Sequence, residues 1–138
     1  MQNDPENQAR QLAGVFSRMA AAVDDYRTGH FDELSEEQRA LLEKTEDRLA
    51  DIHDRLIAIA IEGTLGALAG DMSRIAAVTR EAKQSLRTLK RYADVVKIAS
   101  AAIDVGAAAL SGDTGMIATS IEDLAQMIPN LAKKPQLE

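Results

Sequence analysis

The sequence contains no cysteine and no tryptophan, and aromatic side chains make up only 3% of its 138 residues. Without cysteine, disulfide bonds and thiolate chemistry are excluded. The apolar side chains are mainly Ala, Leu, Ile, Val and Met. These residues suit closely packed helices better than sheets, in which aromatic and β-branched side chains are enriched. We therefore expect an all-α protein without strands.

Histidine is scarce as well, since the chain has only His30 and His53. A di-iron helical bundle needs a Glu-x-x-His motif on two helices, but Arg27 and Ala50 stand three residues before these histidines. The serines fall at helix caps or within helices, with no histidine and acid near them. We expect no catalytic residue, no metal and no cofactor, and hence a protein that is not an enzyme.

Acidic residues outnumber basic ones, 22 to 16, which gives a net charge of −6. Such a chain is repelled as a whole by nucleic acid and anionic lipid. One basic stripe occurs at helical spacing, but Asp94 interrupts it and Tyr92 is its only aromatic neighbour. The residues of this stripe are Arg80, Lys83, Arg87, Lys90 and Lys97. We interpret the stripe as solvated or paired within the chain rather than as a nucleic-acid site.

The length of the chain corresponds to a single domain, residues 1–138, because it is sufficient for one core and too short for two. Its first residues, MQNDPENQAR, lack the basic start and the apolar segment of a signal peptide. The expected compartment is therefore the cytoplasm.

Local signals predict where the helices begin and end. Asp4, Pro5 and Glu6 form a typical helix start, and Gly29 a typical stop, which predicts a helix over 5–28. Ser35 and Gln38 have the spacing of a capping box at the start of a second helix, 36–69. A third helix follows over 72–110 because apolar residues recur there at heptad spacing. A fourth is expected over 114–128, ended by Pro129 and followed by a tail, 129–138.

The two longest helices have similar lengths, and Gly70 and Asp71 between them are suited to a turn. We therefore predict an antiparallel helical bundle built on a long helical hairpin, with coiled-coil packing and two shorter flanking helices. Gly63 and Gly66 leave open a kinked helix that continues through this point. Charges support the hairpin, because folding at Gly70 brings acidic residues of one arm beside basic residues of the other. The expected partners are Glu43, Glu46 and Asp51 with Arg87, Lys90, Arg91 and Lys97.

The stretch LIAIAIEGTLGALAGD, residues 56–71, is almost entirely apolar in an otherwise charged chain. It carries two apolar stripes, and a two-helix arm buries only one of them, so the second marks an interface. The expected interface residues are Ile57, Ile61, Leu65, Leu68, Met72 and Ile75. We expect the apolar hairpin arm, about residues 56–78, to self-associate, most simply as a homodimer, or to bind another helical protein.

An alternative is a membrane-active protein whose Gly-rich hairpin tip inserts into lipid after a trigger. Glu62 and the shortness of the stretch argue against a permanent membrane span.

Overall fold

The computed structural model describes residues 5–62 and 72–133, and no strand occurs within these two ranges. The protein is all-α, as predicted. Its helices are α1 (Pro5–Gly29), α2 (Glu36–Glu62), α3 (Met72–Thr88), α4 (Tyr92–Ser111) and α5 (Thr114–Lys133). A short 3-10 helix, η1 (Phe31–Glu33), joins α1 to α2.

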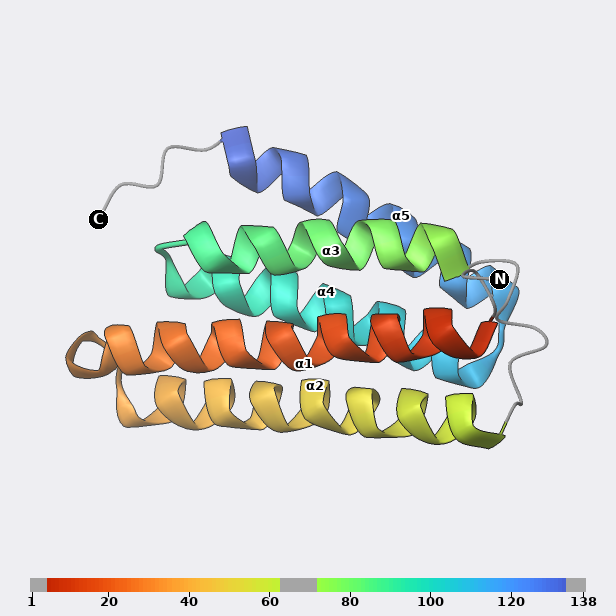
Figure 1. Ribbon diagram of the computed structural model, residues 1–138. Helices are drawn as coiled ribbons and strands as arrows, with labels where there is room; N and C mark the ends of the chain where they lie inside the picture. The colour runs from red at the N-terminus through yellow and green to blue at the C-terminus, as the bar shows by residue number, and fades with distance from the viewer. Residues whose placement is uncertain (1–4, 63–71, 134–138) are drawn as a thin grey trace.

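Successive helices run in opposite directions (Figure 1). Helix α1 packs on α2 and α3, and α4 packs on the same two helices. These four helices form a bundle, and α5 packs on the outside of α3 and α4. No helix covers the side of the bundle between α2 and α4 in the part of the chain that the structure describes.

The helix ends are set by local hydrogen bonds of the expected kind. The Ser35 amide donates to Gln38 Oε1 and the Gln38 amide to Ser35 Oγ, both at 3.0 Å, which is a capping box. Asp113 Oδ1 accepts from the amides of Gly115 and Met116 at the start of α5. The starts of α1, α2, α3 and α5 coincide with the predicted starts.

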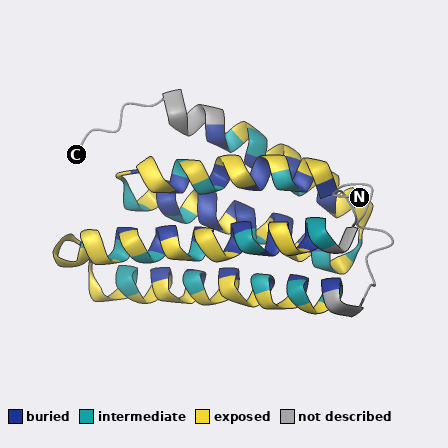
Figure 2. Ribbon diagram, in the orientation of Figure 1, coloured by how far each residue is buried: buried dark blue, intermediate teal, exposed yellow. Residues whose placement is uncertain are grey.

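Apolar side chains from all five helices meet in one core. Each helix alternates between buried and exposed residues along its length, so each contributes one apolar stripe (Figure 2). The largest fully buried side chains are Phe16, Leu12, Met19, Leu42, Leu49, Leu56, Met72, Ile75, Ile98, Ile117, Leu124 and Val23.

The predicted hairpin is only partly correct. Helices α2 and α3 run in opposite directions, but α2 packs on α1 and α4, and α1 lies between α2 and α3 (Figure 1). The reason is the length of α1, which at 25 residues nearly matches the 27 residues of α2. The predicted turn at Gly70 and Asp71 lies outside the described residues.

The third predicted helix, 72–110, is in fact two helices. Helix α3 ends at Thr88, and α4 begins at Tyr92 after Arg91, whose backbone is extended with φ −98° and ψ 133°. The chain then folds back, so that α4 packs on α3 and both bury an apolar stripe. The heptad spacing of apolar residues gives no sign of the break, because α3 and α4 each need an apolar stripe to pack against the core.

The last helix also differs from the prediction, since α5 passes through Pro129 and reaches Lys133. Proline lacks an amide hydrogen and so removes one helical hydrogen bond, that to the carbonyl of residue 125. The helix ends four residues after Pro129, so the loss falls on its final turn.

Candidate interaction surface

The two histidines have different neighbours. The ring of His30 stacks on Tyr26 with centroids 4.0 Å apart, and His53 Nδ1 lies 2.9 Å from the exposed carboxylate of Asp54. Within residues 5–62 and 72–133, no three His, Cys, Asp or Glu side chains are grouped as metal ligands would be. The helices described here also include none that is long and apolar enough to cross a bilayer.

The strongest charge cluster surrounds Arg27, near the end of α1. Its Nε lies 2.7 Å from Glu46 Oε2, its Nη2 lies 2.7 Å from Asp24 Oδ1, and its Nη1 lies 3.5 Å from Glu43 Oε2. The hydrogen bond to Glu46 raises the pKa of Arg27, although desolvation opposes it. Burial, with smaller contributions from the neighbouring carboxylates of Asp24 and Glu43, raises the pKa of Glu46 against the opposing effect of Arg27. The cluster links the end of α1 to α2 through ion pairs.

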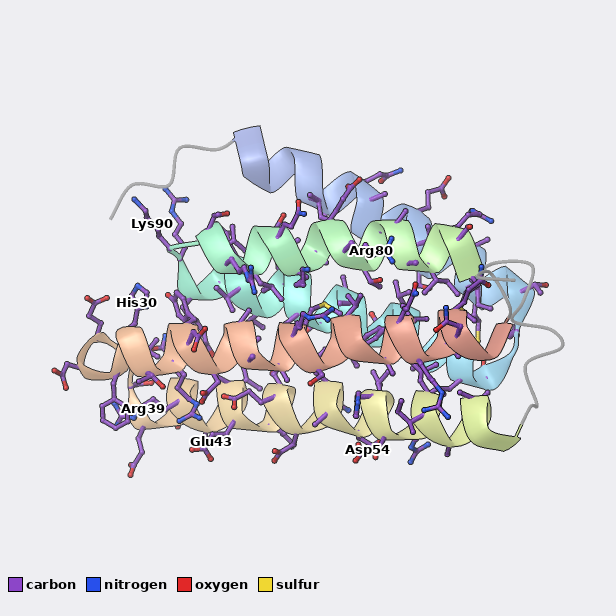
Figure 3. The ribbon with its side chains drawn as sticks, in the orientation of Figure 1. His30, Arg39, Glu43, Asp54, Arg80 and Lys90 are labelled. Carbon is purple, nitrogen blue, oxygen red and sulfur yellow. The ribbon has the colours of Figure 1, made fainter. Side chains whose placement is uncertain are left out.

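This cluster overturns the predicted pairing of acidic α2 residues with the basic residues further along the chain. Glu43 and Glu46 pair with Arg27, and Asp51 pairs with Arg55 one turn away on α2, at 3.0 Å. The physical reason is that α1 separates α2 from α3. Figure 3 shows Glu43 on the outer edge of α2, with α1 between it and α3. The basic residues of that prediction, Arg87, Lys90, Arg91 and Lys97, lie on α3, on α4 and in the break between them.

The predicted interface residues are not gathered on one exposed surface. Met72 and Ile75 are only 2% and 0% exposed and belong to the core, so their assignment to an interface is wrong. Ile57 is half-buried and packs against the core. The other predicted residues fall where the structure gives no side-chain description: Ile61, Leu65 and Leu68.

The uncovered side of the bundle carries a groove of about 620 Å³ between α2 and α4. The buried side chain of Ile52 lies at its base, and the half-buried side chains of Ile103 and Leu110 line its α4 wall. Charged residues of α2 line the other wall: Lys44, Asp47, Arg48, Asp51 and Arg55. An open groove with an apolar base and a charged edge has the character of a helix-binding surface.

A second groove, of about 570 Å³, lies between α4 and α5. Met116 lines it and is 53% exposed, the largest exposure among the big apolar side chains that the structure describes. Three carboxylates also line it: Asp104, Asp113 and Asp123. Ala107 lines both grooves, so they adjoin across α4. We call the two grooves together the α2–α4–α5 face.

The sequence prediction misses this face because its apolar residues have the spacing of an ordinary helix seam. Val96, Ile103 and Leu110 recur every seven residues and match a seam that faces a neighbouring helix. In the structure they are half-buried rather than buried, beside the part of α4 that no helix covers. The break before α4 is the missing information, because it decides which helix faces which.

Comparison of the chain with protein-family models, with curated proteins and with solved structures finds no match.

Proposed function

We propose that this protein is a non-enzymatic helical interaction module that self-associates. The observation that carries the proposal is the α2–α4–α5 face, where Ile103, Leu110 and Met116 remain accessible around two adjoining grooves. Accessible apolar side chains bordered by charged ones offer a partner an apolar contact with a polar rim, as in protein–protein interfaces. The proposal moves the interface from the apolar stretch near residues 56–78 to the α2–α4–α5 face.

The shape of the face favours a protein partner over a small molecule. Its two grooves are open troughs along helices, each bordered by charged side chains. A helix or a second bundle fills such troughs along their length. Burial of a large aliphatic side chain stabilises by roughly 1.5–3 kcal/mol before association costs are subtracted. Half-buried Ile103 and Leu110 gain a part of that amount each.

The decisive experiment is the mass of the protein in solution over the micromolar range, measured by light scattering or sedimentation. The test variant is Ala107→Glu, because Ala107 is exposed and lies where the two grooves meet. The matched control is Ala77→Glu, which alters an exposed alanine on α3 that lines neither groove. We expect a dimer for the wild type and for the control, and a folded monomer for Ala107→Glu.

A wild-type protein that stays monomeric at high micromolar concentration would overturn the proposal. If that monomer also releases dye from liposomes, the membrane-active alternative replaces it. A dimer that Ala107→Glu leaves intact but Ile57→Glu dissociates would return the interface to the end of α2.

A further inference from the structure

The α2–α4–α5 face is electrostatically asymmetric. On α2, the groove is lined by Lys44, Arg48 and Arg55, which are four and seven residues apart and so share one side of the helix. Asp51 on the same wall pairs with Arg55, so these two charges offset each other, and Lys44 and Arg48 outnumber the remaining acidic residue, Asp47. We call Lys44 and Arg48 the basic edge.

The opposite side of the face is acidic. Asp104 on α4 and Asp123 on α5 line the second groove together with Asp113, and the lining of this groove contains no lysine or arginine among the described residues. We call these three carboxylates the acidic edge. In the lining of the two grooves the charge therefore changes from an excess of basic residues on α2 to carboxylates alone beside α4 and α5.

On the basis of the proposed self-association, we infer that the partner seated on this face is a second copy of the chain, related by a two-fold axis parallel to the helices. A two-fold interface presents the same surface from both copies. Rotation about an axis parallel to the helices sets the basic edge of each copy over the acidic edge of the other. Rotation about an axis that crosses the helices sets basic edge on basic edge, which is repulsive.

The centre of the face suits this arrangement. Ala93, Ser100 and Ala107 are exposed and recur every seven residues on α4, so the two α4 helices meet through small side chains along the axis. Ile103 and Leu110 flank this line in the first groove, and Met116 lies in the second. The α2 edge of each copy then lies against the α4–α5 groove of the other copy, and the exposed apolar side chains of both grooves are covered.

Charge reversal tests the orientation directly. The basic-edge variant is Lys44→Glu with Arg48→Glu, which leaves the Asp51–Arg55 ion pair in place. The acidic-edge variant is Asp104→Lys with Asp123→Lys, which leaves Asp113 to cap α5. All four substituted residues are exposed, so circular dichroism and thermal unfolding should remain close to those of the wild type.

Each variant alone should dimerise about tenfold more weakly than the wild type, because like charges then face each other at both ends of the interface. An equimolar mixture of the two variants should form a heterodimer of near wild-type affinity, because every reversed edge then meets a reversed partner. A chain that carries all four substitutions should form homodimers and should not exchange subunits with the wild type.

Three outcomes would contradict the inference. A wild-type dimer that is indifferent to both variants would overturn this orientation and leave the proposed self-association standing. A chain with all four substitutions that pairs with the wild type in preference to itself would indicate an axis across the helices. A wild-type protein that is monomeric at high micromolar concentration would overturn both the orientation and the proposed function.

Discussion

The hydroxyl of Tyr26 donates a hydrogen bond to the backbone carbonyl of Lys90, at 3.0 Å and across 64 residues of sequence. Tyr26 is near the end of α1, and Lys90 lies between α3 and α4, where the backbone leaves the helical conformation. A carbonyl at such a break has no partner within a helix, so a side chain or water must satisfy it. Tyr26 therefore ties the end of α1 to the point at which the chain reverses.

Removal of this donor should weaken the fold without changing it. Tyr26→Phe keeps the ring, which is 7% exposed, and deletes only the hydroxyl. We expect the free energy of unfolding to fall by about 1 kcal/mol in urea denaturation, because the Lys90 carbonyl loses a partner in a partly buried site. Tyr92→Phe is the matched control, since no protein atom in the described ranges hydrogen-bonds to that hydroxyl. An equal loss in both variants would mean that the Tyr26 bond contributes nothing specific.

The break itself can be tested with proline. Ala93 is exposed and occupies the first turn of α4, where proline is tolerated because the amide there has no helical acceptor. We expect Ala93→Pro to lower the free energy of unfolding by less than about 1 kcal/mol, and Ser100→Pro, at an exposed site within the helix, by about 3 kcal/mol or more. Similar large losses in both variants would indicate one continuous helix over 72–110.

The helix starts can be predicted from sequence because the capping hydrogen bonds join residues that are only two or three positions apart. Ser35 and Gln38 satisfy each other three residues apart, and Asp113 accepts from amides two and three residues ahead. The break at residues 89–91 cannot be predicted in this way, because it contains neither glycine nor proline. What stabilises it is distant in sequence: Tyr26 and the packing of α4 on α3.

The candidate surface depends on an arrangement that local patterns do not encode. The apolar content of α4 is evident from sequence, but whether Ile103 and Leu110 are covered depends on which helices lie beside them. Helix α1 fills the space between α2 and α3, and α5 packs on α3 and α4, so none of the described helices covers the side between α2 and α4. The predicted pairing of acidic α2 residues with basic residues of the following helices is wrong for a related reason. Arg27 of α1, which packs on α2, forms ion pairs with Glu43 and Glu46.

Glu46 should make stability depend on pH in a direction opposite to that of an ordinary salt-bridged acid. Burial raises the pKa of Glu46, so the folded protein keeps this proton over a pH range in which the unfolded chain has released it. The stability contributed by Glu46 is complete below the ordinary glutamate pKa of about 4.3 and is lost as the pH rises through the raised value. The wild type should therefore lose stability relative to Glu46→Gln as the pH rises through that interval.

The measurement is chemical denaturation of both proteins at a series of pH values from acidic to neutral. Glu43→Gln is the matched comparison, because it removes an exposed carboxylate from the same arginine, and repulsion by Glu43 contributes to the raised pKa of Glu46, so the loss of stability with rising pH should be smaller in this variant than in the wild type. A wild type that instead gains stability relative to Glu46→Gln with rising pH would show that the Arg27 ion pair outweighs burial.

The close packing of α4 on α2 at Gly106 should be sensitive to one methyl group. A Cβ atom at Gly106 of α4 would lie 2.8 Å and 2.9 Å from the Cδ1 and Cγ2 atoms of Ile52, and 3.0 Å from Cζ of Phe16. Both neighbours are core residues, so Gly106→Ala should lower the free energy of unfolding by about 1–3 kcal/mol through overpacking, although alanine favours helix by up to about 1 kcal/mol. Gly14→Ala on α1 is the matched control, because a Cβ there meets only the Arg18 side chain at an ordinary 3.7 Å. It should raise stability by about 0.5–1 kcal/mol. Denaturant midpoints that shift upward in both variants would show that α4 can move away from α2 and that the packing at Ile52 is loose.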